Sequence, residues 1–297
     1  MKAAPFDYHL AQDLVHAKDL LHEYGHDVKI IAGGQSLVPM MAMRLAKPSH
    51  IVDIARLQEL QTIKQVDDVI SIGAAVKQCS LENNPFASKV PLLEIVLPWI
   101  GHHQTRHRGT VGGSLAHADP SAELPLLAFV LQATLHSDSL VSGQRQYTAK
   151  DFFLGPMWTT LEAQECLTHT DWPIWSGPGI GYAFEETSIR QGDFAMASAV
   201  TQLQIDHDEK VLRLCFGVGG MGGTPYSFED LSSTVIGKHL SIDVINDLCE
   251  QAIQSTDPAS DLHAGALYRR NLAKILLSRT LQQSLSMAKT AINPSLR

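Results

Sequence analysis

Apolar and polar positions in the first quarter of the chain change repeatedly between helical and strand spacing. The first helical pattern consists of Leu10, Leu14, Ala17 and Leu21. Gly25 follows and is expected to end that helix. Short apolar runs predict strands over residues 28–31, 50–54, 62–66 and 69–74. The last two runs flank Asp67-Asp68, which is typical of a β-hairpin. These elements lack the regular repeat of a βαβ fold.

The rest of the chain continues this mixed pattern. Helical periodicity recurs over residues 90–100, 123–131, 242–253 and 262–285. Strand-like runs occupy residues 133–136, 144–148, 196–206 and 211–217. Gly177-Pro178-Gly179-Ile180-Gly181 is the strongest linker signal in the sequence. We therefore expect an α+β protein with its main boundary at residue 177, and a C-terminal part made of a small sheet followed by helices.

Size and charge narrow the class of protein. The 297 residues suffice for two or three domains, since a domain averages roughly 100–200 residues. A net charge of −8 argues against nucleic-acid binding, which needs a basic stripe. The longest apolar run, residues 124–131, is far shorter than the roughly 20 residues that span a bilayer. We expect no membrane span and, without an apolar signal region near Met1, a cytoplasmic location.

The metal-binding residue types do not form a recognisable set. The four cysteines lie far apart, at Cys79, Cys166, Cys215 and Cys249. They encode neither a zinc motif nor an iron–sulfur cluster. His103 and His107 have the spacing of ligands on a helix, but no carboxylate or cysteine completes a set before the break at Gly109. We predict that this chain binds no metal. Arg106 and Arg108, in the same segment, face either cofactor phosphates or solvent.

Two glycine-rich turns are the most distinctive chemistry in the sequence. The first is Ala32-Gly33-Gly34-Gln35-Ser36, and the second is Thr110-Val111-Gly112-Gly113-Ser114. Adjacent glycines let backbone N–H groups approach an anion with no Cβ in the way, and successive N–H groups form an anion-binding concavity. Serine and threonine hydroxyls in both turns add donors. We interpret the turns as two clamps on one pyrophosphate-containing cofactor.

Two other motifs have ordinary explanations. Asp119 or Ser121 caps the helix predicted over 123–131, or else Asp119 accepts hydrogen bonds from a ribose or an adenine. Residues 217–222 match the dinucleotide fingerprint G-x-G-x-x-G literally. However, Gly223-Thr224-Pro225 follows in place of a helix, and Gly237-Lys238 stands where an acidic residue is expected. We predict a glycine turn at the end of a strand there.

Motifs spread over nearly the whole chain form one set. They are residues 32–39 with Arg44-Leu45, residues 108–120, Ala183-Phe184-Glu185-Glu186 with Gly192-Asp193-Phe194-Ala195, and Tyr268-Arg269-Arg270-Asn271-Leu272. This set closely resembles the FAD-binding medium subunit of molybdenum hydroxylases, of the carbon monoxide dehydrogenase and xanthine dehydrogenase type. Two positions depart from the family: His107 stands where asparagine is expected, and Glu185 where some relatives have a cofactor-contacting lysine.

The resemblance implies an α+β fold in two parts. Residues 1–176 would form a two-lobed FAD-binding fold of the vanillyl-alcohol-oxidase (PCMH) type, with lobes at about 1–56 and 57–176. Residues 177–297 would form a C-terminal domain with an antiparallel sheet and helices.

The resemblance also assigns site residues. It implies that residues 32–36 and 110–114 hold the FAD diphosphate, and that Glu123 matches an acidic residue near the cofactor. It implies that Leu167 and Phe194 lie near the flavin ring. From the sequence alone, the alternative for Phe194 is a core position in the C-terminal sheet.

The implied function is that of an electron-transfer subunit that binds FAD. Electrons would arrive from [2Fe–2S] clusters on a small partner subunit, after a large partner subunit oxidises the substrate at a molybdenum–pterin centre. We expect a dimer of such heterotrimers. No catalytic side chain is expected here, because the redox chemistry belongs to the flavin. The alternatives are a stand-alone FAD-dependent oxidase or dehydrogenase of a small molecule and a flavin-free structural subunit.

Overall fold

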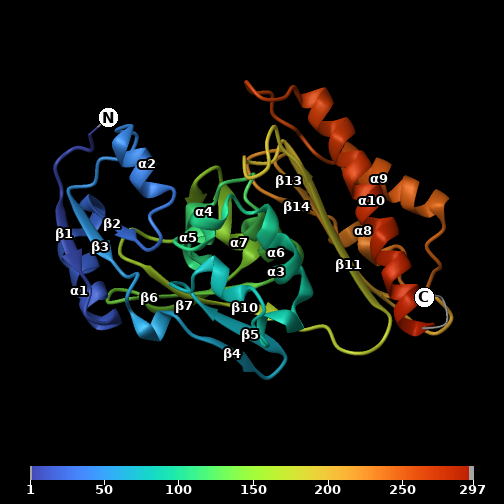
Figure 1. The fold of residues 1–297 in the computed structure, drawn as a ribbon, viewed down its shortest axis with the longest axis horizontal. Helices are drawn as coiled ribbons and strands as arrows, with labels where there is room; N and C mark the ends of the chain where they lie inside the picture. Colours follow the sequence, from blue (N-terminus) through green and yellow to red (C-terminus); the bar gives the residue numbers. More distant parts are fainter. Residues whose placement is uncertain (1, 294–297) are drawn as a thin grey trace.

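The computed structural model describes residues 2–293, which form β-sheets with helices between and beside them (Figure 1). The N-terminal sheet has three parallel strands in the order β1 (Asp7–Leu10), β3 (His50–Asp53) and β2 (Val28–Ile31). Helix α1 (Leu14–Tyr24) packs on this sheet and ends at Gly25, which has φ +54°. Asp13 accepts the His16 N–H and so fixes where the helix begins. Leu10, expected in this helix, therefore lies in β1.

The central sheet has five antiparallel strands. Their order is β4 (Ile63–Val66), β5 (Val69–Gly73), β10 (Cys166–Pro173), β6 (Thr134–Ser139) and β7 (Gly143–Thr148). The hairpin β4–β5 confirms the predicted hairpin, with Asp67 in its turn at φ +49°, and the hairpin β6–β7 confirms the strands predicted over 133–136 and 144–148. Strand β10 lies in the middle of the sheet, yet its apolar pattern is interrupted by Thr168, His169 and Asp171, so the sequence did not predict it.

Short helices fill the space between the central and C-terminal sheets (Figure 1). They are α3 (Pro91–Val96), α5 (Val111–His117), α6 (Glu123–Val130) and α7 (Ala149–Phe152). Helix α6 is apolar on almost every side, as expected for a helix covered on both faces. Its N-cap is Ala122, so the expectation that Asp119 or Ser121 caps it is wrong. The Asp119 carboxylate instead accepts the Ser121 N–H at 2.9 Å, in a turn that precedes the helix.

Several short elements complete the first two-thirds of the chain. They are α2 (Leu37–Ala42), α4 (His103–Arg106), the two-stranded sheet of β8 (Phe153–Gly155) and β9 (Trp158–Thr159), and 3₁₀ turns at Gly25–Asp27, Gln58–Leu60, Gln78–Leu81, Ala87–Lys89 and Leu97–Trp99. The helix predicted over 90–100 is therefore α-helical only to Val96. Pro98 has no N–H to donate, which favours the change to a 3₁₀ turn.

The C-terminal sheet is antiparallel, in the order β11 (Ile180–Thr187), β12 (Ala197–Ile205), β13 (Val211–Gly219) and β14 (Tyr226–Ser227). Every residue of β12 is buried, because helices cover both faces of the sheet. The outer cover is α9 (Ile242–Gln254) and the long helix α10 (Ala266–Ile292), at the right of Figure 1. The glycine-rich segment after β13 leads to β14, and the next helix, α8 (Glu229–Ser233), begins only later. The predicted α+β class is thus confirmed.

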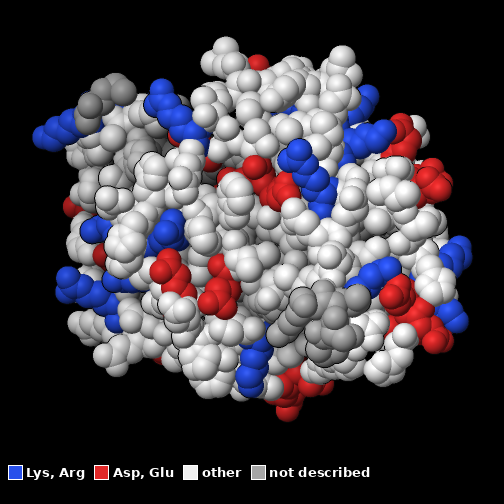
Figure 2. Space-filling model, turned by 45° about the vertical axis from the view of Figure 1, so that its right-hand side comes forward, with Lys and Arg blue, Asp and Glu red and all other residues white. Residues whose placement is uncertain are grey.

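Charged side chains of both signs are interspersed on the face shown in Figure 2. No single-sign field therefore dominates that face. Surface ion pairs in the molecule include Lys289 with Glu209 at 2.5 Å and Lys274 with Glu250. Among residues 2–293, no helix combines the length and the apolar character needed to cross a membrane.

Candidate cofactor site

The first glycine turn connects β2 to α2 and leaves its backbone donors free. Gly34 has φ +71°, a conformation that glycine adopts without strain. Within the described residues, the N–H groups of residues 33–36 have no hydrogen-bond acceptor. The Gln35 side chain folds back to donate to the Gly33 carbonyl at 3.3 Å. Four consecutive free donors form the type of concavity that binds an anion.

The second glycine turn is tied to the central sheet. Thr110 is the N-cap of α5, and its hydroxyl accepts the Gly113 N–H at 3.0 Å. The Val111 N–H donates to Val76 and the Gly112 N–H donates to Ala74, at 2.9 and 3.0 Å. These donors are therefore already used by the protein. Two parts of this turn remain accessible to a ligand: the backbone around exposed Gly113 and the hydroxyl of half-buried Ser114.

The two turns meet directly, through glycines that admit close packing. A Cβ at Gly33 would lie 2.3 Å from the Arg108 carbonyl oxygen and 2.7 Å from the Gly109 Cα. A Cβ at Gly112 would lie 2.5 Å from the Ala74 Cβ, so this glycine lets α5 pack on the sheet. From the sequence, these glycines were expected only to let backbone N–H groups approach an anion. Packing between the turns is a second requirement, which no local pattern reveals.

Glu123 lies at the contact between the central and C-terminal parts of the molecule. Its carboxyl is buried, and burial raises its pKa to about 7. Glu186, on β11, is also buried, and burial followed by the charge of Glu123 raises its pKa to about 8. Glu186 Oε2 has no hydrogen-bond partner among residues 2–293. The charge of Glu123 thus disfavours the ionisation of Glu186, a coupling the sequence did not indicate.

The two residues expected near the flavin ring differ in exposure. Leu167 is 5% exposed and belongs to the apolar core above the central sheet. Phe194 is 61% exposed, so the alternative that places it in the core of the C-terminal sheet is wrong. It lies in the loop between β11 and β12. At Gly192 in this loop, a Cβ would be 2.7 Å from the His102 ring, so the loop packs against the histidine-rich segment.

Arg269, from the Tyr268-Arg269-Arg270 motif, holds this loop in place. The buried guanidinium donates to the Met196 carbonyl at 2.6 Å and to the Gly220 carbonyl at 2.7 Å. It also pairs with Asp261 at 2.5 Å. The Gly220 N–H in turn donates to Pro120 at 2.9 Å, which joins the C-terminal sheet to the segment before α6. The motif thus fixes how the Phe194 loop lies on the rest of the molecule.

The remaining candidates have local partners. Arg106 donates to the Ile100 carbonyl at 3.0 Å and pairs with Glu82 at 3.3 Å, so its guanidinium already has partners within the protein. Arg108 is exposed. Glu185 accepts from Gln283 on α10 at 2.5 Å, so its side chain is directed to the outer cover of the sheet.

These features fit a dinucleotide with a diphosphate. The free donors of residues 33–36 lie beside the backbone of Arg108-Gly109, where the second turn begins. An anion bound there meets backbone dipoles and hydroxyls without having to displace a side chain. Phe194, nearer the C-terminal sheet, offers an exposed aromatic face.

Both parts of the chain match known protein families. Residues 4–175 match the FAD binding domain in molybdopterin dehydrogenase, and residues 182–284 match the CO dehydrogenase flavoprotein C-terminal domain. The chain is 36% identical over 290 residues to the 6-hydroxypseudooxynicotine dehydrogenase complex subunit alpha of Paenarthrobacter nicotinovorans, with 97% of each chain covered.

Solved structures give the same result. The fold superposes on a chain of quinoline 2-oxidoreductase from Pseudomonas putida 86 with a TM-score of 0.90 and 33% identity, covering 97% of this chain and 99% of that one. It superposes on a chain of carbon monoxide dehydrogenase from Hydrogenophaga pseudoflava with a TM-score of 0.92 and 30% identity, covering 96% and 99%.

The fold and the paired glycine turns define a flavoprotein of the FAD-binding class. With both family matches and full-length relatives, the chain belongs to the FAD-binding medium subunits of molybdenum hydroxylases. The resemblance inferred from the sequence motifs is confirmed.

Proposed function

We propose that this chain holds FAD between its two glycine turns and transfers electrons through it, as one subunit of a heteromeric molybdenum hydroxylase. The observation that carries the proposal is the run of free N–H donors at residues 33–36 beside the second turn. Bound FAD supplies the electron-accepting and electron-donating chemistry, and the protein supplies binding, orientation and electrostatics.

Each candidate residue has a defined task in this proposal. The diphosphate is held by Ala32, Gly33, Gly34, Gln35 and Ser36 on one side and by the exposed end of the second turn, Gly113 and Ser114, on the other. Thr110, Val111 and Gly112 position that end, because the Val111 and Gly112 N–H groups are bonded to residues 74–76 and the Thr110 hydroxyl accepts the Gly113 N–H. Leu167 and Phe194 bound the space for the flavin ring, and Glu123 keeps an uncharged acid nearby below about pH 7.

The partners are inferred from the relatives, one of which is named as a subunit of a dehydrogenase complex. We propose a small subunit with [2Fe–2S] clusters and a large subunit with a molybdenum–pterin cofactor, assembled in the cytoplasm as a dimer of heterotrimers. We also place the domain boundary at residues 176/177, between the segments matched by the two families. The substrate is selected on the large subunit, which agrees with the different substrates named for the relatives.

Purification of the complex tests this proposal. The untagged chain, expressed with its genomic neighbours, should be yellow with flavin absorbance and should co-purify with iron and molybdenum in two further subunits. A yellow chain that is isolated alone and oxidises a small molecule by itself would favour the stand-alone oxidase. A colourless chain that still assembles with both partners would favour the structural subunit.

A further inference from the structure

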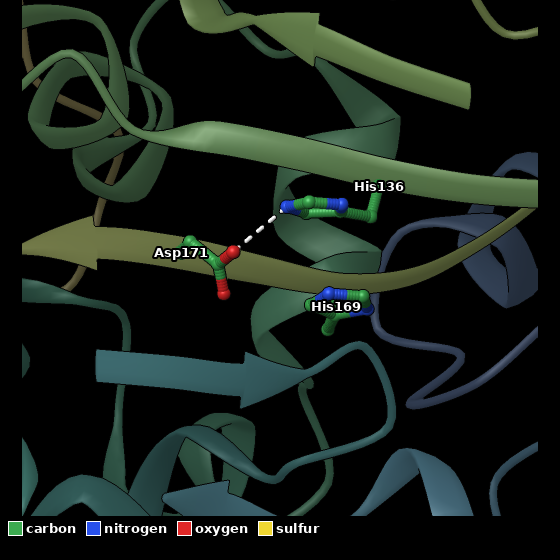
Figure 3. Close-up of side chains that lie close together, drawn as sticks. All are labelled: His136, His169 and Asp171. Atoms are coloured by element: carbon green, nitrogen blue, oxygen red, sulfur yellow. Dashed lines mark ion pairs between the residues drawn. The ribbon is translucent and has the colours of Figure 1, made fainter. Parts of the chain in front are cut away.

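Three side chains on the outer face of the central sheet form a cluster that the flavin site does not use. His136 lies on β6, and His169 and Asp171 lie two residues apart on β10, so all three project from one face (Figure 3). One ligand atom from each residue lies within 4.8 Å of the other two. His136 Nε2 is 2.8 Å from Asp171 Oδ2, and the two imidazole rings stack with centroids 4.0 Å apart.

A break in strand register brings the two histidines opposite each other. His169 pairs with His136, and the register shifts between Leu167 and His169. A bulge of this kind redirects a side chain and is common beside functional sites. Without the shift, the residue opposite His136 would be Thr168, and the two rings would not share one place on the sheet.

Hydrogen bonds fix which nitrogen of His169 is available. The Thr168 hydroxyl donates its single proton to the His136 carbonyl at 3.1 Å. Its oxygen therefore accepts from His169 Nδ1, which is 3.0 Å away. This arrangement places the His169 proton on Nδ1 and leaves the Nε2 lone pair free. A second hydrogen bond that orients a ligating histidine in this way is a regular feature of metal sites.

The remaining polar atoms of the cluster are incompletely satisfied. Among residues 2–293, buried Asp171 Oδ1 and His136 Nε2 have no partner with hydrogen-bond geometry, despite the short contact between His136 and Asp171. All three side chains are half-buried, so an ion from solvent can reach them.

We propose that His136, His169 and Asp171 bind one divalent transition-metal ion, and that Zn²⁺ is the ion that suits them best. Two imidazole nitrogens, one carboxylate oxygen and a water complete the four ligands that zinc prefers. Bonds of about 2.0–2.1 Å at tetrahedral angles put ligand atoms roughly 3.3 Å apart. The two rings stack within 11° of parallel, so one imidazole must turn out of the stack for both ring nitrogens to face the ion. The ion would cross-link β6 to β10 at the bulge. This proposal differs from the sequence-based prediction that the chain binds no metal.

Zinc titration of the full-length, untagged chain tests the site. The protein is stripped with a chelator and titrated with Zn²⁺ alone against a chromophoric competitor, and flavin content and circular dichroism verify the fold. We expect one Zn²⁺ per wild-type chain and loss of this binding in His136→Ala and His169→Ala. The matched control is His103→Ala, because the His103 and His107 rings also lie close together, with centroids 3.8 Å apart, but have no third ligand among the described residues. Zinc binding in this variant should be unchanged.

Two milder variants keep the test decisive if an alanine variant fails to fold. Thr168→Val keeps the shape of the strand but removes the acceptor that orients His169, and should weaken zinc binding by about 10–100-fold. Lys64→Gln should tighten it, because Lys64 pairs with Ser71 and Ser71 pairs with Asp171 across the sheet, so a positive charge on this face disfavours a bound cation. No stoichiometric zinc in the wild-type chain, or zinc affinity that is the same in wild type and Thr168→Val, would overturn the proposal.

Discussion

Gly33 and Arg108 lie so close together that a Cβ on Gly33 would come within 2.3 Å of the Arg108 carbonyl oxygen. The two glycine turns are therefore one structural unit, although about 75 residues of sequence separate them. The same residue pair joins the N-terminal sheet to the central part of the molecule. A substitution at Gly33 thus acts on both the proposed diphosphate site and the contact between the turns.

Gly33→Val should both lower FAD content and destabilise the protein. The added side chain meets backbone atoms, which cannot rotate away, and overpacking of this kind typically costs about 1–3 kcal/mol. The measurements are the flavin-to-protein absorbance ratio and the melting temperature. Gly265→Ala is the control, because a Cβ there meets nothing within 4 Å. Full flavin occupancy and an unchanged melting temperature in Gly33→Val would contradict both roles of the residue.

The buried pair Glu123 and Glu186 should make stability fall as the pH rises. The folded-state pKa values, about 7 and about 8, lie above the ordinary value of 4.5. Between those limits the folded state binds more protons than the unfolded state, so the free energy of unfolding decreases with rising pH. This contribution is complete below about pH 4.5 and is lost by about pH 8.

Glu186→Gln should remove part of this pH dependence. The amide stays uncharged, so the variant should gain stability over wild type at pH 8.5 but not at pH 5. In domains of 150–250 residues, 1 kcal/mol shifts the melting temperature by roughly 2–4 °C, so a difference of a few degrees is expected at pH 8.5. Melting curves at both pH values give the comparison. Parallel pH profiles for variant and wild type would show that the carboxyl is not buried in its uncharged form.

Local patterns predicted most of the fold, because many strands and helices here follow simple periodicity. The hairpins of the central sheet, the strands β12 and β13 and the helices α9 and α10 all lie where apolar spacing placed them. Strand β10 was missed, since it lies in the middle of the sheet but carries His169 and Asp171 on its outer face and the polar Thr168 beside them. The motif His169-x-Asp171 on a strand was the available signal for the proposed metal site.

The candidate site was predictable only in part. The glycine turns stood out as motifs, but the contact of Gly33 with Arg108 depends on tertiary structure. The same holds for the coupling of Glu123 to Glu186, which comes from two elements that meet only in the folded molecule. Glu185 and Glu186 are neighbours in sequence, yet strand alternation sends one to α10 and the other to the inner helices.

Arg269→Met should destabilise the protein by about 2–4 kcal/mol, because two hydrogen bonds from a charged donor are lost inside the molecule. Arg269→Lys should recover little of this, since one ammonium cannot reproduce the fork of the guanidinium. The neighbouring Arg270 is exposed and donates a single hydrogen bond, to the Thr256 carbonyl at 3.3 Å, so the matched control Arg270→Met is expected to lie within about 1 kcal/mol of wild type. Equal chemical-denaturation midpoints for Arg269→Met and Arg270→Met would disprove the role assigned to Arg269.

Phe194→Ala should change the flavin without destabilising the fold. Phe194 is 61% exposed, so its truncation removes little buried apolar surface, whereas Phe184→Ala, at a position 6% exposed, should cost about 3–5 kcal/mol. An aromatic side chain against one face of the flavin ring limits access to that face. Reaction by hydride transfer needs a separation of about 3–3.5 Å. We therefore expect Phe194→Ala to retain FAD but to alter flavin fluorescence, redox potential or the rate of reaction with oxygen. Flavin spectra and oxidation rates identical to wild type, together with full FAD content, would place Phe194 away from the ring.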